Sequence, residues 1–491
     1  MNRPIRIMAI GCLVMFLALM VNANYVQFLN ADELNARNDN RRVLNAEFSR
    51  ERGPILVAND SVARSDPSDD EFEYQRTYTQ PELYAHLTGY YSYIYGARDL
   101  EQSENGVLSG SDPRLFVNRV IDLVGSEQPT GGSVLLTIDP RAQRAAYEGL
   151  TNLAGNTTGA AVALDPNTGE ILAMVSVPGY DPNRLASHDP DEAEKAWQNL
   201  NDDPGQPLRD RSREEIYPPG STFKLVTAAA ALSNGYEPDT MVNGSAALTF
   251  KGISYTLRNQ SGDSCGAERI TLTQALAVSC NVAFGDIGRD LGEAALRDQA
   301  DAFGFGDSDV IRDLPAAVSQ FTAPDADPLD EPQTSLSAIG QFDVAASPLQ
   351  MAMVAAGIAN NGTVMRPYVV SEVRGPDLDV LEATSPERLH EAVSSDVAAE
   401  LTQMMETVVT DGTAGSAAIP GVPVAAKTGT AQSSAERKPY AWFVSFAPAD
   451  NPQVAVAVFV QDATGVARTD VSGGGLAGPI AKAMMESVIS R

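Results

Sequence analysis

Two groups of apolar segments, far apart in the chain, constrain the fold of residues 156–491. The first group, Ala160–Leu164 and Glu170–Val177, is joined by Asp-Pro-Asn-Thr-Gly, a sequence typical of a hairpin turn. Helical patterns follow, including Ser221–Ser233 and Leu272–Leu291. The second group closes the chain with three segments: Val422–Ala426, Ala441–Ala447 and Val454–Gln461. This order predicts one antiparallel sheet of five strands with helices on both sides.

The chain before this unit has a different character. Residues 31–155 alternate short apolar segments with turns and contain no cluster of reactive side chains. They predict a small non-catalytic α+β domain, a pedestal or an interaction module. The whole chain is therefore expected to be an α+β multidomain protein, divided into 1–30, 31–155 and 156–491.

The N-terminus predicts a membrane anchor. Arg3 and Arg6 precede an apolar run, Ile7–Val21, which continues amphipathically to Leu29. Basic residues before such a run keep the N-terminus in the cytoplasm and direct the rest outward. Counted to Leu29, the run reaches the ~20 residues that cross a bilayer. We expect an uncleaved single-pass anchor in the cell membrane with an extracytoplasmic remainder; a signal peptide cleaved near Ala23 is the alternative.

Composition excludes several classes of function. Sixty-four acidic and 35 basic residues give a formal net charge of −29. This leaves no basic field for nucleic-acid phosphates and is typical of an acidic exported surface. Three His and three Cys, with no C-x-x-C pair, supply too few ligands for a zinc ribbon or a multi-His site, so no metal is expected.

Cys265 and Cys280 are the only cysteines beyond the apolar N-terminal run. An oxidising exterior permits a disulfide between them, worth about 3 kcal/mol for a loop of this length. Sequence does not set the separation of two Cα atoms, so a disulfide and two free buried thiols stay equally open.

A serine that a lysine can activate lies at a predicted helix start. Ser221-Thr222-Phe223-Lys224 is the only S-x-x-K sequence in the chain and follows Pro218-Pro219-Gly220. Residues i and i+3 share a helix face, so Lys224 can reach the Ser221 hydroxyl. A desolvated, neutral lysine is one of the few bases besides histidine that make a serine nucleophilic. Amides at the helix start favour the charge of an oxyanion.

Two further motifs follow Ser221, at about 60 residues and then about 150 more. Ser279-Cys280-Asn281 lies on a helical pattern, where the hydroxyl can relay a proton and the amide can hold a peptide group. Lys427-Thr428-Gly429-Thr430 follows the strand Val422–Ala426, where the lysine can bind a carboxylate and lower the pKa of another lysine. Gly429 permits close approach of a ligand, and the Thr430 amide can complete an oxyanion hole.

In this order the three motifs resemble those of the penicillin-binding proteins, the serine D,D-transpeptidases that cross-link peptidoglycan. The resemblance runs from about Thr158 to the C-terminus and includes Asp165–Val175, the Tyr217–Gly220 lead-in and Ile339–Gln341. The single anchor, the non-catalytic region opened by Arg52–Ile55 and the lack of a glycosyltransferase-like domain are similar to class B of this family.

The resemblance implies a serine penicillin-binding transpeptidase domain at 156–491 and acyl transfer without a cofactor. Ser221 would attack the D-Ala-D-Ala end of a stem peptide with Lys224 as base, and an amine of a second stem would resolve the acyl-enzyme. β-Lactams would acylate the same serine, and cell division or cell shape, with division-complex partners, would be the setting. The other motif residues would line the cleft: Ser279, Asn281, Lys427, Thr428, Gly429 and Thr430.

Three alternatives share these motifs. A class A β-lactamase needs a Glu-x-x-Leu-Asn loop, and none lies between Asn281 and Lys427. A D,D-carboxypeptidase differs only in letting water reach the acyl-enzyme, which the sequence does not exclude. A membrane-anchored β-lactam-binding scaffold or sensor without turnover also stays open, although sensors normally carry several spans.

Overall fold

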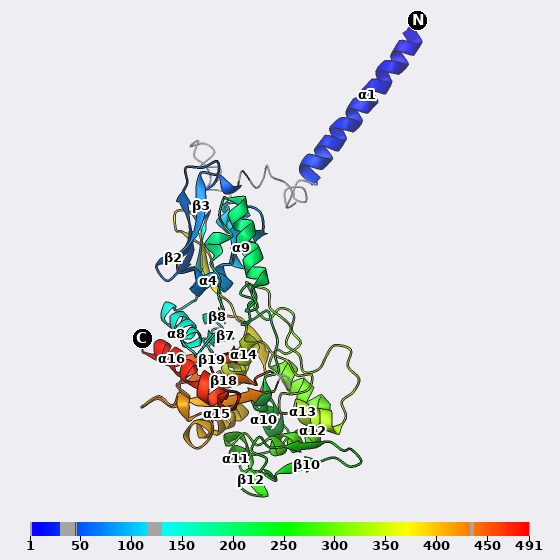
Figure 1. The fold of residues 1–491 in the computed structure, drawn as a ribbon. Helices are drawn as coiled ribbons and strands as arrows, with labels where there is room; N and C mark the ends of the chain where they lie inside the picture. Colours follow the sequence, from blue (N-terminus) through cyan, green and yellow to red (C-terminus); the bar gives the residue numbers. More distant parts are fainter. Residues whose placement is uncertain (1, 30–44, 46, 116–129, 433–436, 491) are drawn as a thin grey trace.

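The computed structural model describes residues 2–29, 45, 47–115, 130–432 and 437–490 (Figure 1). At the N-terminus, helix α1 (Asn2–Asn24) continues into a π-helical turn (Tyr25–Leu29). Residues Arg3–Gln27 have a mean hydropathy of 2.3 in their most apolar window and are long enough to cross a membrane. The predicted apolar N-terminal helix is therefore present.

The pedestal is built on a six-stranded sheet in the order β15-β14-β6-β1-β2-β3. Strands β1 and β6 are parallel, and the other neighbours are antiparallel. Two of the strands come from far beyond residue 155, and α9 (Pro190–Asp202) also lies beside the pedestal (Figure 1). The pedestal in space is therefore completed by later parts of the chain. Its strands are β1 (Ile55–Val57), β2 (Asp60–Pro67), β3 (Tyr74–Tyr78), β6 (Ser133–Leu136), β14 (Val370–Arg374) and β15 (Val380–Ala383).

A buried carboxylate holds the pedestal together. Glu101 is fully buried and accepts hydrogen bonds from Arg52 Nε at 2.6 Å and Arg76 Nε at 2.7 Å. Burial acts to raise the pKa of Glu101, but the two guanidiniums outweigh it and keep the pKa below its ordinary value. Such a triad is costly to break, because removal of one partner leaves a buried charge unpaired.

A second ionic cluster joins the pedestal to the segment that leads to Ser221. Arg213 is fully buried and forms ion pairs with Asp99 of the pedestal and with Asp210, the latter at 2.9 Å. Next to it, Arg98 of the pedestal pairs with Glu214 at 2.6 Å. The chain thus reaches the Ser221 turn from a firmly paired interface between the two parts.

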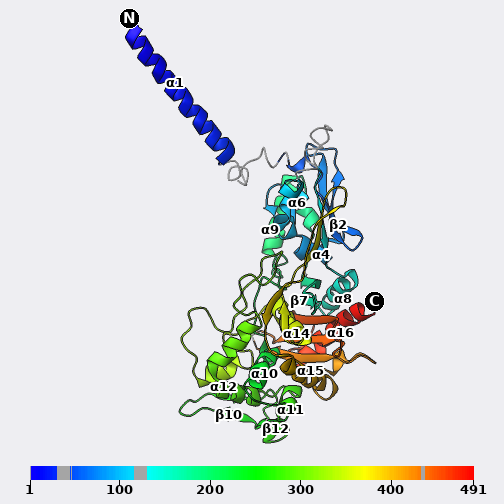
Figure 2. The ribbon, with the colours of Figure 1, turned by 180° about the vertical axis from the view of Figure 1, so that it is seen from behind.

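The second part contains the predicted five-stranded antiparallel sheet, in the order β17-β18-β19-β7-β8. Nearly every residue of β18 and β19 is buried, as expected for strands covered on both faces. Helices α8 and α16 lie side by side and pack on one face, and α14 packs on the other (Figures 1 and 2). The strands are β7 (Thr157–Leu164), β8 (Ile171–Val177), β17 (Ala425–Ala431), β18 (Tyr440–Ala447) and β19 (Val454–Ala463).

Helices α10, α11, α12 and α13 form a helical region beside this sheet, and α4 lies with the pedestal strands (Figure 1). The principal helices are α4 (Pro81–Thr88), α8 (Pro140–Thr151), α10 (Lys224–Ser233), α11 (Leu272–Ala277), α12 (Asn281–Ala302), α13 (Glu331–Ser337), α14 (Pro348–Ala359), α15 (Ser395–Thr410) and α16 (Gly478–Ile489). Short strands form two-stranded ribbons: β4 (Tyr91–Ser92) with β5 (Gly96–Ala97), β9 (Met241–Asn243) with β12 (Arg269–Thr271), β10 (Ala247–Thr249) with β11 (Thr256–Arg258), and β13 (Thr363–Met365) with β16 (Arg388–Glu391).

Two predicted elements differ from the structure. The helix expected over Leu272–Leu291 is two helices, because Ser279 adopts a left-handed backbone with φ 60° that a helix cannot contain. The strand expected to end at Ala426 is β17, which continues to Ala431. The third motif therefore lies within a strand and not after it, since the backbone of Lys427–Ala431 pairs with β18 despite its polar side chains.

Candidate active site

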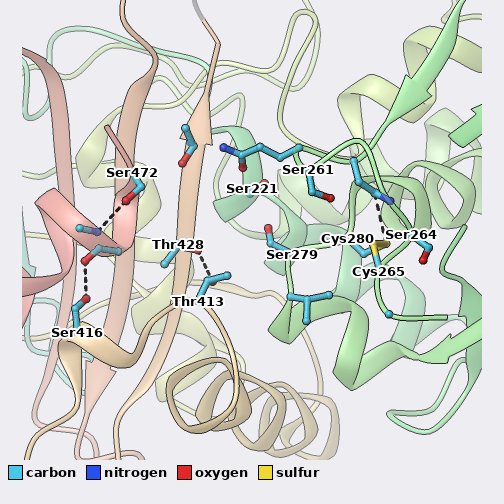
Figure 3. Close-up of a pocket in the computed structure, with 18 residues that line it drawn as sticks. Ser221, Ser261, Ser264, Cys265, Ser279, Cys280, Thr413, Ser416, Thr428 and Ser472 are labelled. Atoms are coloured by element: carbon cyan, nitrogen blue, oxygen red, sulfur yellow. Dashed lines mark hydrogen bonds between the residues drawn. A yellow bond between two sulfur atoms is a disulfide. The ribbon is translucent and has the colours of Figure 1, made fainter. Parts of the chain in front are cut away.

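The three motifs meet in one cleft of about 860 Å³ between β17 and the helical region (Figure 3). Ser221, Ser279, Thr428 and Thr430 line it, together with many other hydroxyls and the glycine-rich segment 472–475. Among the described lining residues there is no carboxylate and no guanidinium. The two lysines of the motifs, Lys224 and Lys427, are buried and are not among these lining residues.

A tight turn places Ser221 just before α10. Residues Gly220–Thr222 form a 3-10 turn, and Gly220 has a φ of 56°, a conformation that favours glycine. A Cβ at Gly220 would lie 2.9 Å from the Cβ of Ala431 in β17. The Gly220 amide donates to Gly340 O at 2.9 Å, so the segment around Gly340 supports the turn that carries Ser221.

Lys224 is fully buried one turn after Ser221. Its Nζ donates to Ser279 O at 2.8 Å and to Asn281 Oδ1 at 2.7 Å, and lies 3.2 Å from Ser279 Oγ. Burial, and secondly the charge of Lys427, hold the pKa of Lys224 well below its ordinary value. A neutral amine that spends its two N–H groups on two carbonyl oxygens keeps a lone pair that can accept a proton.

The expected contact between Lys224 and Ser221 takes a different form. The hydrogen bonds of Lys224 all go to the Ser279–Asn281 motif, and within the described residues none involves the Ser221 hydroxyl. The half-buried Ser221 side chain lies in the cleft instead (Figure 3). The second motif thus orients the amine, and the nucleophile stays accessible.

Ser279 connects the two lysines. It lies in the break between α11 and α12, and its Oγ accepts a hydrogen bond from Lys427 Nζ at 2.9 Å. Lys427 is also fully buried and donates to Thr428 O at 3.0 Å. Burial lowers the pKa of Lys427 to about 7. The Ser279 hydroxyl therefore lies between two amines that both lose protons readily, which suits a proton relay.

The third motif lies on the outermost strand of the sheet. Among the described residues, β17 pairs with β18 alone, so its other edge is available to hydrogen-bond an extended peptide. The Thr428 hydroxyl lies at the cleft, 2.6 Å from the hydroxyl of Thr413 (Figure 3). Gly429 has a second requirement inside the protein: a Cβ there would lie 2.9 Å from Trp442 Cβ and 3.0 Å from Pro219 O.

Cys265 and Cys280, left open by the sequence, form a disulfide with Cα atoms 5.9 Å apart (Figure 3). The bond ties the middle residue of the second motif to a loop that lines the cleft. In the same loop Asn259 Oδ1 accepts a hydrogen bond from the Val282 amide, at 3.0 Å, in the first turn of α12. Sequence reasoning missed Asn259, Thr413 and Trp442, because no local pattern marks residues that act through partners distant in the chain.

The part of the chain that the structure describes contains no group of three or more His, Cys, Asp or Glu side chains arranged to hold a metal ion. The chemistry that the cleft supports is that of its own groups: a hydroxyl nucleophile, a neutral amine, a relay hydroxyl, a second amine and strand amides. This set fits acyl transfer to serine.

Comparison with known proteins gives two family matches. Residues 159–486 match the penicillin-binding protein transpeptidase domain, and residues 52–134 match the penicillin-binding protein A dimerisation domain. The peptidoglycan D,D-transpeptidase PbpA of Mycolicibacterium smegmatis is 43% identical over 494 residues, covering 100% of this chain and 99% of that protein. PbpA of Mycobacterium tuberculosis is 42% identical over 498 residues, with the same coverage.

Solved structures of penicillin-binding proteins are also similar to this chain. Penicillin-binding protein A from M. tuberculosis, as its ceftriaxone acyl-enzyme, superimposes with a TM-score of 0.87 at 41% identity, covering 91% of this chain and 100% of that one. The D,D-transpeptidase domain of a peptidoglycan glycosyltransferase from Eggerthella lenta gives a TM-score of 0.76 at 30% identity, covering 90% of this chain and 99% of that one.

Proposed function

The chain belongs to the class B penicillin-binding proteins, and we propose that it cross-links peptidoglycan stem peptides as a D,D-transpeptidase, through an acyl-enzyme on Ser221. One observation carries the assignment of the site: the Ser279 hydroxyl lies between Lys224 and Lys427, in the cleft that contains Ser221. This arrangement supplies a base, a relay and an anion-binding group to a single nucleophile.

Substrate binding uses the free edge of β17. The D-Ala-D-Ala end of the donor stem lies along the strand, and its carboxylate binds at Lys427 and the Thr428 hydroxyl. The carbonyl of the penultimate D-Ala then faces Ser221. Its oxygen points to the amides of Ser221 and Thr430, which form the oxyanion hole.

In the acylation step, neutral Lys224 accepts the proton of the Ser221 hydroxyl as Oγ attacks the carbonyl carbon. Negative charge collects on the carbonyl oxygen in the oxyanion hole. The C–N bond then breaks, and the departing D-Ala amine takes a proton delivered from Lys224, with Ser279 as relay. The product is an ester between Ser221 and the donor stem.

In the second half of the reaction, the acyl-enzyme is resolved by the reverse of these steps, with a different amine as the attacking group. An amino group of a neighbouring stem attacks the ester carbonyl and loses a proton to Lys224, and Ser221 Oγ leaves and regains a proton. A β-lactam presents a similar amide carbonyl and carboxylate, so it acylates Ser221 as well. The set of reacting groups requires no cofactor.

The cellular setting follows from α1. With Arg3 and Arg6 on the cytoplasmic side, the N-terminal apolar helix holds the protein in the cell membrane and places the domains at 31–155 and 156–491 outside it. This is the compartment that contains peptidoglycan. A role in cell division or cell shape, with partners docking on the pedestal, completes the proposal.

The first experiment is intact mass spectrometry of the detergent-solubilised full chain after exposure to a penicillin. We expect a stable adduct of one penicillin mass, absent from Ser221→Ala. Rapid return to unmodified protein with hydrolysed drug would identify a β-lactamase instead. No adduct at any drug concentration would contradict the proposed nucleophile.

Turnover then separates transpeptidase from carboxypeptidase. The full chain is incubated with a D-Ala-D-Ala pentapeptide and a D-amino acid as amine acceptor, and the products are weighed by mass spectrometry. A transpeptidase yields the peptide with its terminal D-Ala exchanged for the acceptor. Tetrapeptide alone would identify a carboxypeptidase, and adduct formation without any turnover would identify a β-lactam-binding scaffold.

A further inference from the structure

The turn that carries Ser221 has few hydrogen-bond donors of its own. Pro218 and Pro219 precede it, and neither has a backbone N–H. The two residues can therefore be held only through their carbonyl oxygens. Pro219 O accepts from Thr222 Oγ1 at 2.9 Å, a bond within the turn. Pro218 O accepts from Trp442 Nε1 at 3.0 Å, a bond to the sheet.

Trp442 reaches Pro218 by crossing the K-T-G strand where that strand has no side chain. It lies in β18 directly opposite Gly429 of β17. The ring is fully buried and packs on Phe459, with ring centroids 4.4 Å apart, and this packing fixes the orientation of the indole. A Cβ on Gly429 would lie 2.9 Å from Trp442 Cβ, closer than such atoms approach. The glycine of this motif therefore lets β17 lie close to both Trp442 and the turn, since a Cβ there would also lie 3.0 Å from Pro219 O and 3.1 Å from Thr222 Cγ2.

From this contact we infer that Trp442 is a positioning residue, whose indole N–H holds the Ser221 turn against β17 and thereby sets the oxyanion hole. The inference rests on the proposed function. The two amides of that hole come from separate elements, Ser221 from the turn and Thr430 from the strand. Each donor must lie about 2.7–3.1 Å from the position of the oxyanion to stabilise it, so the turn and the strand must keep a fixed relative position.

Binding of the ligand and the acylation step then depend on different parts of the site. Ground-state binding of a carboxylate depends on Lys427 and Thr428, which belong wholly to β17. Loss of the Trp442 hydrogen bond leaves that strand intact and loosens the attachment of the turn to the sheet, while the Gly220 amide still donates to Gly340 O. The rate of acylation from the bound state then falls, and the affinity for the ligand stays the same.

The chain offers a matched pair of variants, because Trp442 and Trp197 are its only tryptophans. Trp197 lies in α9 beside the pedestal, stacked on Tyr95 with ring centroids 4.4 Å apart. In the full-length protein, Trp442→Phe keeps a ring and removes the N–H, and Trp197→Phe makes the same change far from the cleft. Stopped-flow acylation by a penicillin gives the binding constant and the acylation rate separately, and intact mass gives the fraction of active protein.

We expect Trp442→Phe to lower the acylation rate about tenfold, as the loss of one positioning hydrogen bond predicts. The binding constant and the active fraction should match those of Trp197→Phe. A merely structural role would lower the active fraction and the melting temperature while each folded molecule reacted at the wild-type rate. That result, or an unchanged acylation rate, would overturn the inference.

A second measurement needs no change at position 442. In ¹⁵N-labelled Trp197→Phe, a single indole resonance reports Trp442. We expect its N–H to exchange slowly with D₂O and its resonance to shift once Ser221 is acylated. Fast exchange in the folded protein would overturn the inference even if Trp442→Phe failed to fold. If neither the wild type nor Trp197→Phe forms an adduct, the proposed function fails; if both react and Trp442→Phe reacts equally fast, only this inference fails.

Discussion

Lys224 Nζ and Asn281 Oδ1 lie 2.7 Å apart, so the amide of the second motif fixes the direction in which the buried amine presents its lone pair. The amide is uncharged, and this matters as much as its position. A carboxylate in its place would attract a proton to Lys224 and remove the base. The S-x-N motif therefore acts on the electrostatics of the first motif.

Asn281→Asp tests this directly. The new carboxylate should raise the pKa of Lys224 and lower the acylation rate at neutral pH about 100-fold, with recovery as the pH rises. The measurement is the second-order acylation rate against pH. Asn281→Ala is the control, because it loses the hydrogen bond without adding charge and should keep more activity at neutral pH. An Asn281→Asp protein as fast as Asn281→Ala would contradict the proposal.

The pH profile of acylation should be bell-shaped. Lys224 must be neutral, so the rate rises as the pH passes the lowered pKa of this lysine. Lys427 must be charged to bind a carboxylate, so the rate falls again as the pH rises through its pKa of about 7. A β-lactam whose carboxylate is esterified should react more slowly and lack the falling limb. A falling limb of equal size for the ester would exclude Lys427 as its source.

The free energy of unfolding should rise with pH, because burial lowers the pKa of Lys427. The pKa of Lys427 is about 7 in the folded chain and returns to its ordinary value near 10.5 on unfolding. Between these values the unfolded chain binds more protons, so the free energy of unfolding rises by up to about 1.4 kcal/mol per pH unit. Denaturant unfolding at several pH values measures this slope. Lys427→Met should have a smaller slope of unfolding free energy against pH than the wild type. Equal slopes in the two proteins would show that Lys427 is not desolvated.

The paired hydroxyls of Thr413 and Thr428 predict a defect in carboxylate binding. Thr413→Val keeps the shape and removes the hydroxyl that orients Thr428, which should weaken binding by about 1 kcal/mol, roughly fivefold. The acylation rate from the bound state should stay near the wild-type value. Thr413→Ser retains the hydroxyl and is the control. A loss of acylation rate with unchanged binding would assign Thr413 a different role.

The ionic cluster between the two parts predicts a large stability effect. Arg213→Ala leaves buried Asp99 and Asp210 without their main cation and should lower the free energy of unfolding by about 3–5 kcal/mol. Arg209→Ala lies in the same segment and breaks only the half-exposed pair with Glu215, for about 0–1 kcal/mol. Calorimetry of the two variants compares them. Equal losses would show that the buried cluster contributes no more than a surface pair.

The sequence predicted the parts of this structure that depend on local pattern. The five strands followed from their apolar runs, and the Ser221 turn followed from its prolines and glycine. The break at Ser279 could not be predicted, because apolar residues continue across it at Val278, Cys280 and Val282. The strand character of Lys427–Thr430 was hidden by polar side chains that serve the site.

Contacts between distant segments account for the rest. Trp442 and Pro218 are 224 positions apart, and nothing in either local sequence indicates the bond between them. The local sequence likewise does not indicate that Thr413 contacts Thr428, or that β14 and β15 join the pedestal sheet. Such pairings depend on the assembled fold, and a single sequence carries no record of them.

The pedestal sheet has a consequence for how the chain is made. Strand β6 lies between β1 and β14, and Leu136 pairs with Val370, a residue 234 positions later (370 − 136). At about 5–20 residues per second, synthesis takes roughly 10–50 s to cover that distance. During this interval the nascent chain presents one unpaired edge of β6, which can bind another strand. The pedestal sheet is therefore completed only after most of the catalytic unit has been synthesised.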